Sequence, residues 1–208
     1  MSTATTEDVV LNTRAKLLAS TSDLIEAGSY QSASVQAICE RAGVNKGSFY
    51  YYFPSKQALV LAMIDAAWEE TVGEVLVPVL TAPSPIEERV ARLFDCMYDD
   101  QKTHKRTFGK ATGCLFGSLA AETSTLEEPI RARLSEIFDQ WVGHLNTALQ
   151  QAVEQDEAPP TLDTEATAWI LLAGLEGLLL LSKTADDPGI LRNAGAELIR
   201  TVFDLEHL

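Results

Sequence analysis

The segment from Ser34 to Lys56 constrains the fold more than any other part of this 208-residue chain. Its pattern predicts two short helices joined by a tight turn at residues 42–44. Gly43 supplies the backbone freedom that a sharp corner between two helices needs. Ile38 and Val44 are spaced so that both can be buried beneath the turn. The segment therefore predicts a helix-turn-helix unit.

The second of these two helices carries polar and aromatic side chains on one face. Asn45 is a suitable N-cap, and Phe49 and Phe53 lie four residues apart, so they can anchor the helix to its domain. A helix that is held by one face and presents donors on the other is what a reader of the DNA major groove requires. The positions expected to point away from the core are Lys46, Gly47, Ser48, Tyr50 and Tyr51.

The stretch AGVNKGSFYYYFPSKQAL resembles the second half of the DNA-binding domain of TetR-type transcriptional regulators. Nearly every position of the family pattern is filled, from the small-Gly-Val turn through Lys-Gly-Ser to the aromatic run and the Ser-Lys start of the next helix. The resemblance is strong over about residues 10–65 and fades to a general helical pattern beyond. It implies a repressor that a small-molecule effector releases from a palindromic DNA operator.

The side chains expected to contact DNA come from the first three helices and the start of the fourth. Gln36 is placed to meet a base edge, with adenine as the favoured partner, whereas Lys46 reads guanine or contacts a phosphate. Tyr52 stands where the family often has His, so a base contact there is less well supported. The expected contacts are Thr13, Arg14, Ser34, Gln36, Asn45, Lys46, Gly47, Ser48, Tyr50, Tyr51, Tyr52 and Lys56.

The formal net charge of −14 is unfavourable for DNA binding if it is spread over the whole chain. Residues 1–56, however, carry five basic and five acidic side chains, so the net charge falls entirely on the rest of the chain. An acidic body repels phosphate and can orient a neutral DNA-binding domain toward the duplex. A surface that merely keeps the protein soluble is the alternative, and the sequence leaves both open.

Helical periodicity runs through almost the whole chain, and no convincing strand is found. We therefore expect an all-α fold of about nine helices. Residues 1–56 are expected to form the DNA-binding domain and residues 57–208 the effector-binding and dimerisation domain, with a fourth helix over 55–77 linking them. That helix is expected to run until Pro78, and a short helix is expected at residues 107–110.

The two C-terminal helices are the expected seam of a homodimer, because one DNA-binding domain offers too little contact for a specific site. The run from Trp169 to Leu181 is apolar nearly all round, unlike a helix that faces water. The resemblance implies a four-helix interface between subunits. Within the run, Glu176 is either an edge residue facing water or a polar group in a ligand pocket. The expected interface residues are Trp169, Ala173, Gly174, Gly177, Leu178, Leu181, Leu198 and Val202.

The body is expected to hold an effector site for a small apolar or electrophilic molecule. Any one of the candidate side chains is more often an ordinary core residue than part of a ligand-site wall. The expected lining is Phe94, Met97, Tyr98, Cys114, Leu115, Phe116, Phe138, Trp141, Leu145, Leu172, Leu175 and Glu176.

The segment from Gly113 to Glu122 resembles a Gly-Cys-Leu-x-x-x-Leu-x-x-Glu pattern in one subgroup of TetR-type regulators, some of which sense electrophiles or oxidants through a cysteine. The thiol of Cys114 lies near a helix start, where the backbone dipole favours the thiolate, and Lys110 adds to this effect. Lys183 is a candidate cationic partner. A thiol-based sensing repressor is therefore an alternative function, against a buried Cys114 that only packs.

Several classes of protein fit the composition poorly. The N-terminus has no signal-peptide pattern, and the apolar run of about 14 residues around Glu176 is short for a membrane span. Three cysteines without paired spacing, Cys39, Cys96 and Cys114, suggest a cytoplasmic protein, with the first two in the core. No catalytic constellation or metal-ligand cluster is evident, so we expect no enzyme, no metal and no cofactor. A helical carrier or enzyme is the alternative from another class.

Overall fold

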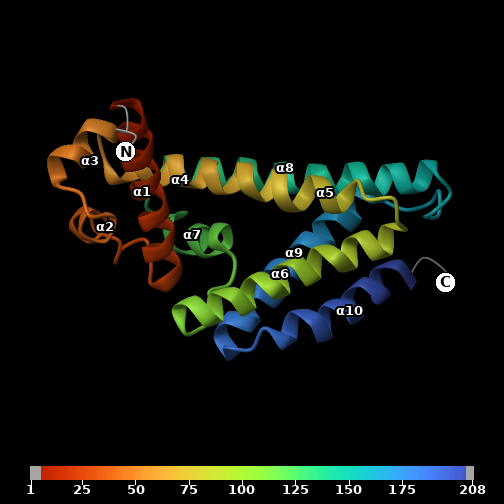
Figure 1. Ribbon diagram of the computed structural model, residues 1–208. Helices are drawn as coiled ribbons and strands as arrows, with labels where there is room; N and C mark the ends of the chain where they lie inside the picture. The colour runs from red at the N-terminus through yellow and green to blue at the C-terminus, as the bar shows by residue number, and fades with distance from the viewer. Residues whose placement is uncertain (1–5, 205–208) are drawn as a thin grey trace, which may run out of the picture. The chain divides into compact units, whose positions relative to one another are not determined.

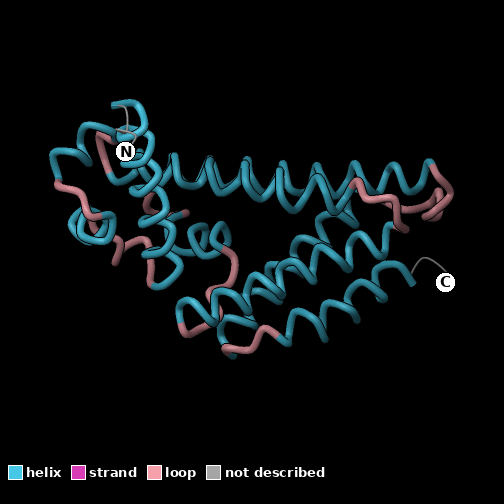
Figure 2. Tube along the Cα trace, viewed as in Figure 1, coloured by secondary structure: helices cyan, strands magenta, loops and turns pink. Residues whose placement is uncertain are grey.

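The computed structural model describes the backbone of residues 6–204 and the side chains of residues 12–203. This part of the chain is helical and contains no strand, which confirms the expected all-α fold (Figure 2). With η1 and α5 counted as continuations of α4, nine helices lie in the described part. The chain divides into two compact units, each of which is described by itself.

The first unit contains the chain up to Trp68 together with residues 118–134. The second segment was not expected in this unit, because the sequence placed everything after residue 56 in the body. Helix α7 therefore begins in the second unit and ends in the first. The helices that lie wholly or mainly in the first unit are α1 (Thr6–Ala27), α2 (Val35–Ala42), α3 (Lys46–Tyr52) and α4 (Lys56–Glu70) (Figure 1).

In the second unit, α10 packs against both α9 and α6. Two glycines permit this close approach. A Cβ at Gly174 would overlap the Leu198 side chain, and a Cβ at Gly195 would lie 2.7 Å from the Phe94 ring. The remaining elements are η1 (Thr71–Leu76), α5 (Val77–Leu80), α6 (Ile86–Phe108), α7 (Leu115–Thr123), α8 (Glu128–Glu154), α9 (Thr164–Ala185) and α10 (Gly189–Asp204) (Figure 1).

Two expected helix boundaries are wrong. The fourth helix does not end before Pro78 but continues through it to Leu80, by way of the π-helical segment η1. In η1 the Val77 N–H bonds the Val72 carbonyl, five residues back. Because proline clashes with the carbonyl four residues before it, a wider turn lets the helix pass. The short helix at residues 107–110 is absent, because α6 runs to Phe108 and ends at Gly109 in the left-handed conformation.

Candidate nucleic-acid interface

The helix-turn-helix forms as its local signals predict. Ser34 Oγ accepts a hydrogen bond of 3.1 Å from the Ala37 N–H, and Asn45 Oδ1 accepts one of 2.8 Å from the Ser48 N–H. These are the N-caps of α2 and α3. Gly43 lies between the helices at φ +66°, where a side chain would be strained. The turn and both helix starts are therefore fixed by contacts between residues close together in the chain.

Helix α3 is anchored by one face, as expected. The side chain of Phe49 is fully buried and that of Phe53 is nearly so, and their ring centroids lie 6.4 Å apart. On the other face, Tyr50 is 56% exposed and Tyr51 is 78% exposed. Both side chains carry hydroxyl groups, which can donate and accept hydrogen bonds. The outward face of α3 is therefore a surface with hydrogen-bonding capacity.

Most of the other expected DNA contacts are also accessible. Lys46, Gly47, Gln36 and Arg14 are exposed. The Gln36 amide donates to the Glu40 carboxylate at 2.9 Å, which points it along α2, and the Arg14 guanidinium lies 5.6 Å from the centroid of the Phe53 ring. The half-buried members of the predicted set are Thr13, Ser48 and Tyr52.

Lys56 is placed differently from the expectation. Its ammonium group donates to the Tyr30 carbonyl and lies 3.9 Å from the centroid of the Tyr30 ring. Burial lowers the pKa of Lys56, and the nearby Glu122 and Glu127 carboxylates act in the opposite direction. The ammonium is therefore engaged inside the first unit, which leaves it poorly placed to clamp a phosphate. The preceding residue, Ser55, caps α4, and its Oγ accepts a hydrogen bond of 3.0 Å from the Ala58 N–H.

Helix α9 leaves a row of large apolar side chains exposed. Trp169 and Leu181 were expected on this face, and Ile170 and Leu180 join them, all between 45% and 62% exposed. Ile170 lies three residues before Ala173 and Leu180 lies seven after it, so the helical spacing could have placed both on the face already expected from Trp169 and Ala173. Ala173 and Gly177 are also exposed, whereas Leu178, Leu198 and Val202 are half-buried and Gly174 packs against its own α10.

By length and composition alone, α9 also qualifies as a membrane span. It has 22 residues, a mean hydropathy of 1.5 over its most apolar stretch, and one third of that stretch (33%) buried. The sequence interpretation rested on a run of about 14 residues and therefore underestimated this helix. The same properties are found in helices that a protein partner covers, so composition does not distinguish the two.

The side chains expected to line an effector pocket are divided among several environments. Phe116 and Trp141 are buried and meet edge to face, with ring centroids 6.3 Å apart. Phe94 packs against Gly195, and the Tyr98 ring lies 4.0 Å from the Arg192 guanidinium. The buried members are Phe94, Phe116, Trp141, Leu145, Leu172 and Leu175, and the half-buried members are Met97, Tyr98, Cys114, Leu115, Phe138 and Glu176.

Cys114 and Glu176 lie together, and the Glu176 side chain is turned inward and does not face water; its role in a ligand pocket stays a prediction. Burial raises the pKa of the Cys114 thiol well above its ordinary value, and the Glu176 carboxylate raises it further. This direction is opposite to the lowered pKa expected for a thiol at a helix start. Burial also raises the pKa of Glu176, while its hydrogen bond with Cys114 lowers it. The resting pair is a thiol beside a carboxyl group, and the Lys183 side chain passes over Gly113.

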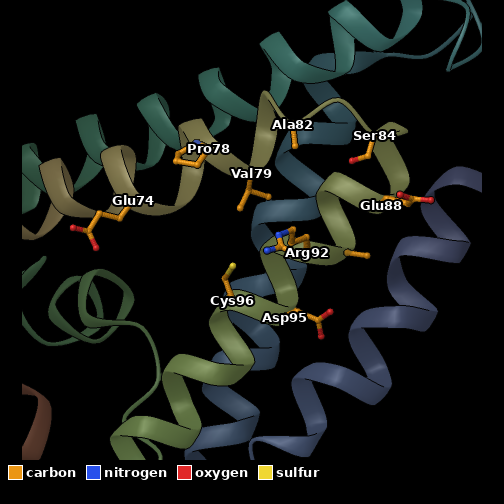
Figure 3. Close-up of a pocket in the computed structure, with 10 residues that line it drawn as sticks. Glu74, Pro78, Val79, Ala82, Ser84, Glu88, Arg92, Asp95 and Cys96 are labelled. Atoms are coloured by element: carbon orange, nitrogen blue, oxygen red, sulfur yellow. The ribbon is translucent and has the colours of Figure 1, made fainter.

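A separate cavity of about 770 Å³ lies between η1 and α5 on one side and α6 on the other (Figure 3). Its wall combines the apolar side chains of Pro78, Val79 and Ala91 with charged groups. Cys96, which the sequence assigned to the core, lines this cavity and is half-buried. Cys39 is buried as expected. The charged residues of the wall are Glu74, Glu88, Arg92 and Asp95.

An anchored α3 with an exposed tyrosine face, followed by a separate helical body, defines a helix-turn-helix DNA-binding regulator. Residues 17–63 match the bacterial regulatory proteins of the tetR family, and residues 87–198 match the tetracyclin repressor-like C-terminal domain. The chain belongs to the TetR family of transcriptional regulators and is not an enzyme. Among the residues that the structure describes, no group of three His, Cys, Asp or Glu side chains is arranged to hold a metal ion.

Relatives with known names support this assignment. The transcriptional regulator AcuR of Cereibacter sphaeroides is 30% identical over 154 residues, which cover 74% of this chain and 68% of AcuR. The repressor NemR of Escherichia coli is 27% identical over 146 residues, covering 69% of this chain and 70% of NemR. The crystal structure of reduced NemR superposes with a TM-score of 0.79 at 26% identity, covering 89% of this chain and 94% of that one.

Proposed function

We propose that this protein is a homodimeric repressor that binds a palindromic operator through α3 and is released when an effector binds its body. The observation that carries the proposal is the exposed face of α3, with Lys46, Tyr50 and Tyr51 held outward by the buried Phe49. Lys46 would read guanine or a phosphate, and the tyrosine hydroxyls would donate to phosphates. Gln36 and Arg14 would add contacts at the edges of this face.

The exposed row on α9 supports the homodimer. A monomer that kept Trp169, Ile170, Leu180 and Leu181 in water would lose the favourable free energy of burying them, and such a patch on a soluble protein marks an interface. Gly177 has no atom within 4 Å of the position a Cβ would take, so a second backbone can come close there. A two-fold dimer through α9 and α10 would present two α3 helices to the two halves of a palindrome.

The cavity between η1 and α6 is a second candidate for the effector site, beside the predicted lining around Cys114. Its volume of about 770 Å³ falls within the range of small-molecule sites. Three carboxylates and one guanidinium on an apolar floor would suit an amphipathic ligand with a positive charge. A π-helical segment forms one wall, and such segments are frequent at functional sites.

Selection from a pool of randomised DNA duplexes tests the proposed function directly. The full-length protein should enrich a palindromic sequence, and complex size should show two subunits on each site. A retained pool with no enriched sequence would contradict the proposal. Screening apolar and cationic compounds for release of the enriched duplex would then identify the class of effector, with a control duplex of scrambled sequence.

Control by thiol chemistry is the second candidate, and it is supported by the hydrogen bond of 3.4 Å that Cys114 Sγ accepts from the Gly117 N–H, which favours the thiolate. Addition of the thiol to a quinone forms an S–C bond and breaks the π bond of a ring C=C, and the thiol proton ends on the quinone oxygen. Because burial and the Glu176 carboxylate keep the resting thiol protonated, the thiol reacts only as its proton leaves. Quinone should release wild-type protein from the operator but leave Cys114→Ser bound, and Cys96→Ser serves as the matched control. Release of the Cys114→Ser variant would eliminate this candidate.

A further inference from the structure

A group of five side chains in the first unit is not used by the DNA-reading face. It consists of Tyr30, Lys56, Gln57, Glu122 and Glu127, and we call it the carboxylate clamp. The Glu122 carboxylate accepts hydrogen bonds from two successive backbone amides, 2.8 Å from the Tyr30 nitrogen to Oε2 and 2.9 Å from the Gln31 nitrogen to Oε1. One side chain thus fixes two consecutive peptide groups.

Glu127 completes the clamp from the start of α8. Its Oε1 accepts a hydrogen bond of 3.0 Å from the Tyr30 hydroxyl, and its Oε2 accepts one of 2.6 Å from the Gln57 amide. The Lys56 ammonium lies over the Tyr30 ring and donates to the Tyr30 carbonyl. Tyr30 is 8% exposed, and burial together with the Glu127 hydrogen bond raises its pKa to about 12. The members of the clamp therefore hold one another in place.

The carboxylate clamp contacts the helix-turn-helix at both of its ends. Tyr30 and Gln31 lie in the turn that leads into α2, which begins at Val35. Lys56 and Gln57 follow directly after α3, whose C-cap is Phe53. Both ends are held by carboxylates from the segment of residues 118–134. The direction in which α2 and α3 leave these ends is therefore set by contacts with that segment.

The charges of Glu122 and Lys56 cannot be explained by the stability of their own helices. Glu122 lies in the last turn of α7, where the negative end of the helix dipole repels a carboxylate. Lys56 is the first residue of α4, where the positive end repels a cation. These two charges are unfavourable for their own helices and favourable only toward the other members of the clamp, whereas Glu127, directly before α8, is also favourable for that helix. This arrangement indicates that the charges serve the contacts between the segment of residues 118–134 and the ends of the helix-turn-helix.

We propose that Glu122 and Glu127 are positioning residues for operator binding, which set the orientation of α2 and α3 without touching DNA. The inference rests on the proposed DNA-binding function. It also gives the segment of residues 118–134 a regulatory role, because any shift of that segment moves both ends of the helix-turn-helix together. Effector binding or thiol modification that displaces α7 would act on operator affinity through these two carboxylates.

The test is a titration of the selected operator with wild-type protein, Glu122→Gln and Glu127→Gln at one salt concentration. A side-chain amide at position 122 can accept through one oxygen only, so one of the two backbone amides loses its partner. We expect the Kd for the operator to rise about 10-fold or more for Glu122→Gln, and less for Glu127→Gln. Hydrogen exchange at the Tyr30 and Gln31 amides should accelerate in the first variant. Glu128→Gln is the matched control, because Glu128 is exposed and pairs with Arg131 on its own helix.

Stoichiometric titration separates positioning from simple loss of fold. A positioning role raises the Kd while the fraction of active protein stays at the wild-type value; a purely structural role lowers the active fraction and leaves the Kd unchanged. That second pattern, or an unchanged Kd in both variants, would overturn the inference. If Glu122→Gln does not fold, Glu127→Gln decides alone. A wild-type protein that selects no sequence would refute the proposed function, and with it this inference, before any variant is made.

Discussion

Helices α3 and α9 both leave large side chains exposed, but the chemistry of the two faces differs. On α3 the exposed groups are tyrosines with hydroxyls beside a lysine, whereas on α9 they are Trp169, Ile170, Leu180 and Leu181. A partner that covers α3 must replace hydrogen bonds to water, and DNA phosphates and base edges can do so. A partner that covers α9 needs only apolar surface, as a second copy of the same helix would supply. Both faces are exposed, and the difference in their polarity indicates that they suit different kinds of partner.

The most drastic way to break this comparison is to place charge on the α9 face. Ile170→Glu combined with Leu181→Glu buries four carboxylates in a two-fold interface, which should raise the dimer dissociation constant about 1000-fold or more. Analytical ultracentrifugation measures this change. Leu126→Glu is the matched control, because Leu126 is 63% exposed but lies outside α9. A dimer that survives the double substitution would show that α9 is not the seam.

Changes on α3 should have a smaller effect and a different signature. Lys46→Ala and Tyr50→Ala should each raise the operator Kd about 10-fold or more, because each removes contacts from both subunits. The dimer should persist in ultracentrifugation, in contrast to the α9 variants. Lys102→Ala provides the control, since Lys102 is an exposed lysine of the body that pairs with Asp99. Unchanged operator affinity in both α3 variants would refute the assignment of this face.

The buried side of α9 differs from its exposed apolar face, because it carries the Glu176 carboxylate, which contacts Cys114. Burial first, and then the Glu176 carboxylate, raise the pKa of Cys114, so the thiolate fraction at neutral pH is low. Glu176→Gln removes the second cause, which lowers this pKa and increases the thiolate. Alkylation of Cys114 by iodoacetamide should then accelerate about threefold to tenfold at pH 8, as followed by mass spectrometry. Cys96 serves as the internal reference, and a slower reaction in the variant would contradict the assignment.

The smallest expected effect comes from a substitution that tests whether a second subunit covers Gly177. Gly177→Ala places a methyl group in space that is open within the chain. If a second backbone packs there, the methyl should raise the dimer dissociation constant about 10-fold. Gly143→Ala, at an exposed glycine of α8 with equally open surroundings, should leave the dimer unchanged and stabilise the fold by up to about 1 kcal/mol. If Gly177→Ala and Gly143→Ala both stabilise the fold and leave the dimer intact, Gly177 faces solvent and no second backbone packs on it.

The helix-turn-helix could be predicted from the sequence because its determinants are local. The caps Ser34 and Asn45, the turn at Gly43 and the pair Phe49 and Phe53 all act over three to five residues, and the structure confirms each of them. The family pattern added the expectation of a DNA-binding surface. Which of these residues contact DNA stays a prediction.

The carboxylate clamp could not be predicted, because its partners are distant in sequence. Glu122 and the Tyr30 amide are 92 residues apart, and a backbone N–H leaves no trace in the sequence. The environment of Cys114 was missed for a similar reason, since Glu176 approaches it only in the folded unit. The apolar effector lining was uncertain because a Phe or Leu looks the same in a core and in a cavity wall. Only the position of neighbouring helices decides between them.

The π-helical turn at residues 71–76 has a consequence for changes in chain length. Successive residues of an α-helix are related by a fixed rotation about the helix axis. Deleting one residue therefore rotates all the residues that follow about that axis. A π-helical segment already contains one residue more than an ordinary α-helical segment of the same length would. Deletion of Gly73, which has no neighbour within 4 Å of the position a Cβ would take, can convert the segment to ordinary α-helix and keep the rod continuous. The segment of residues 71–76 is thus a place where the chain can lose one residue while the helix stays continuous.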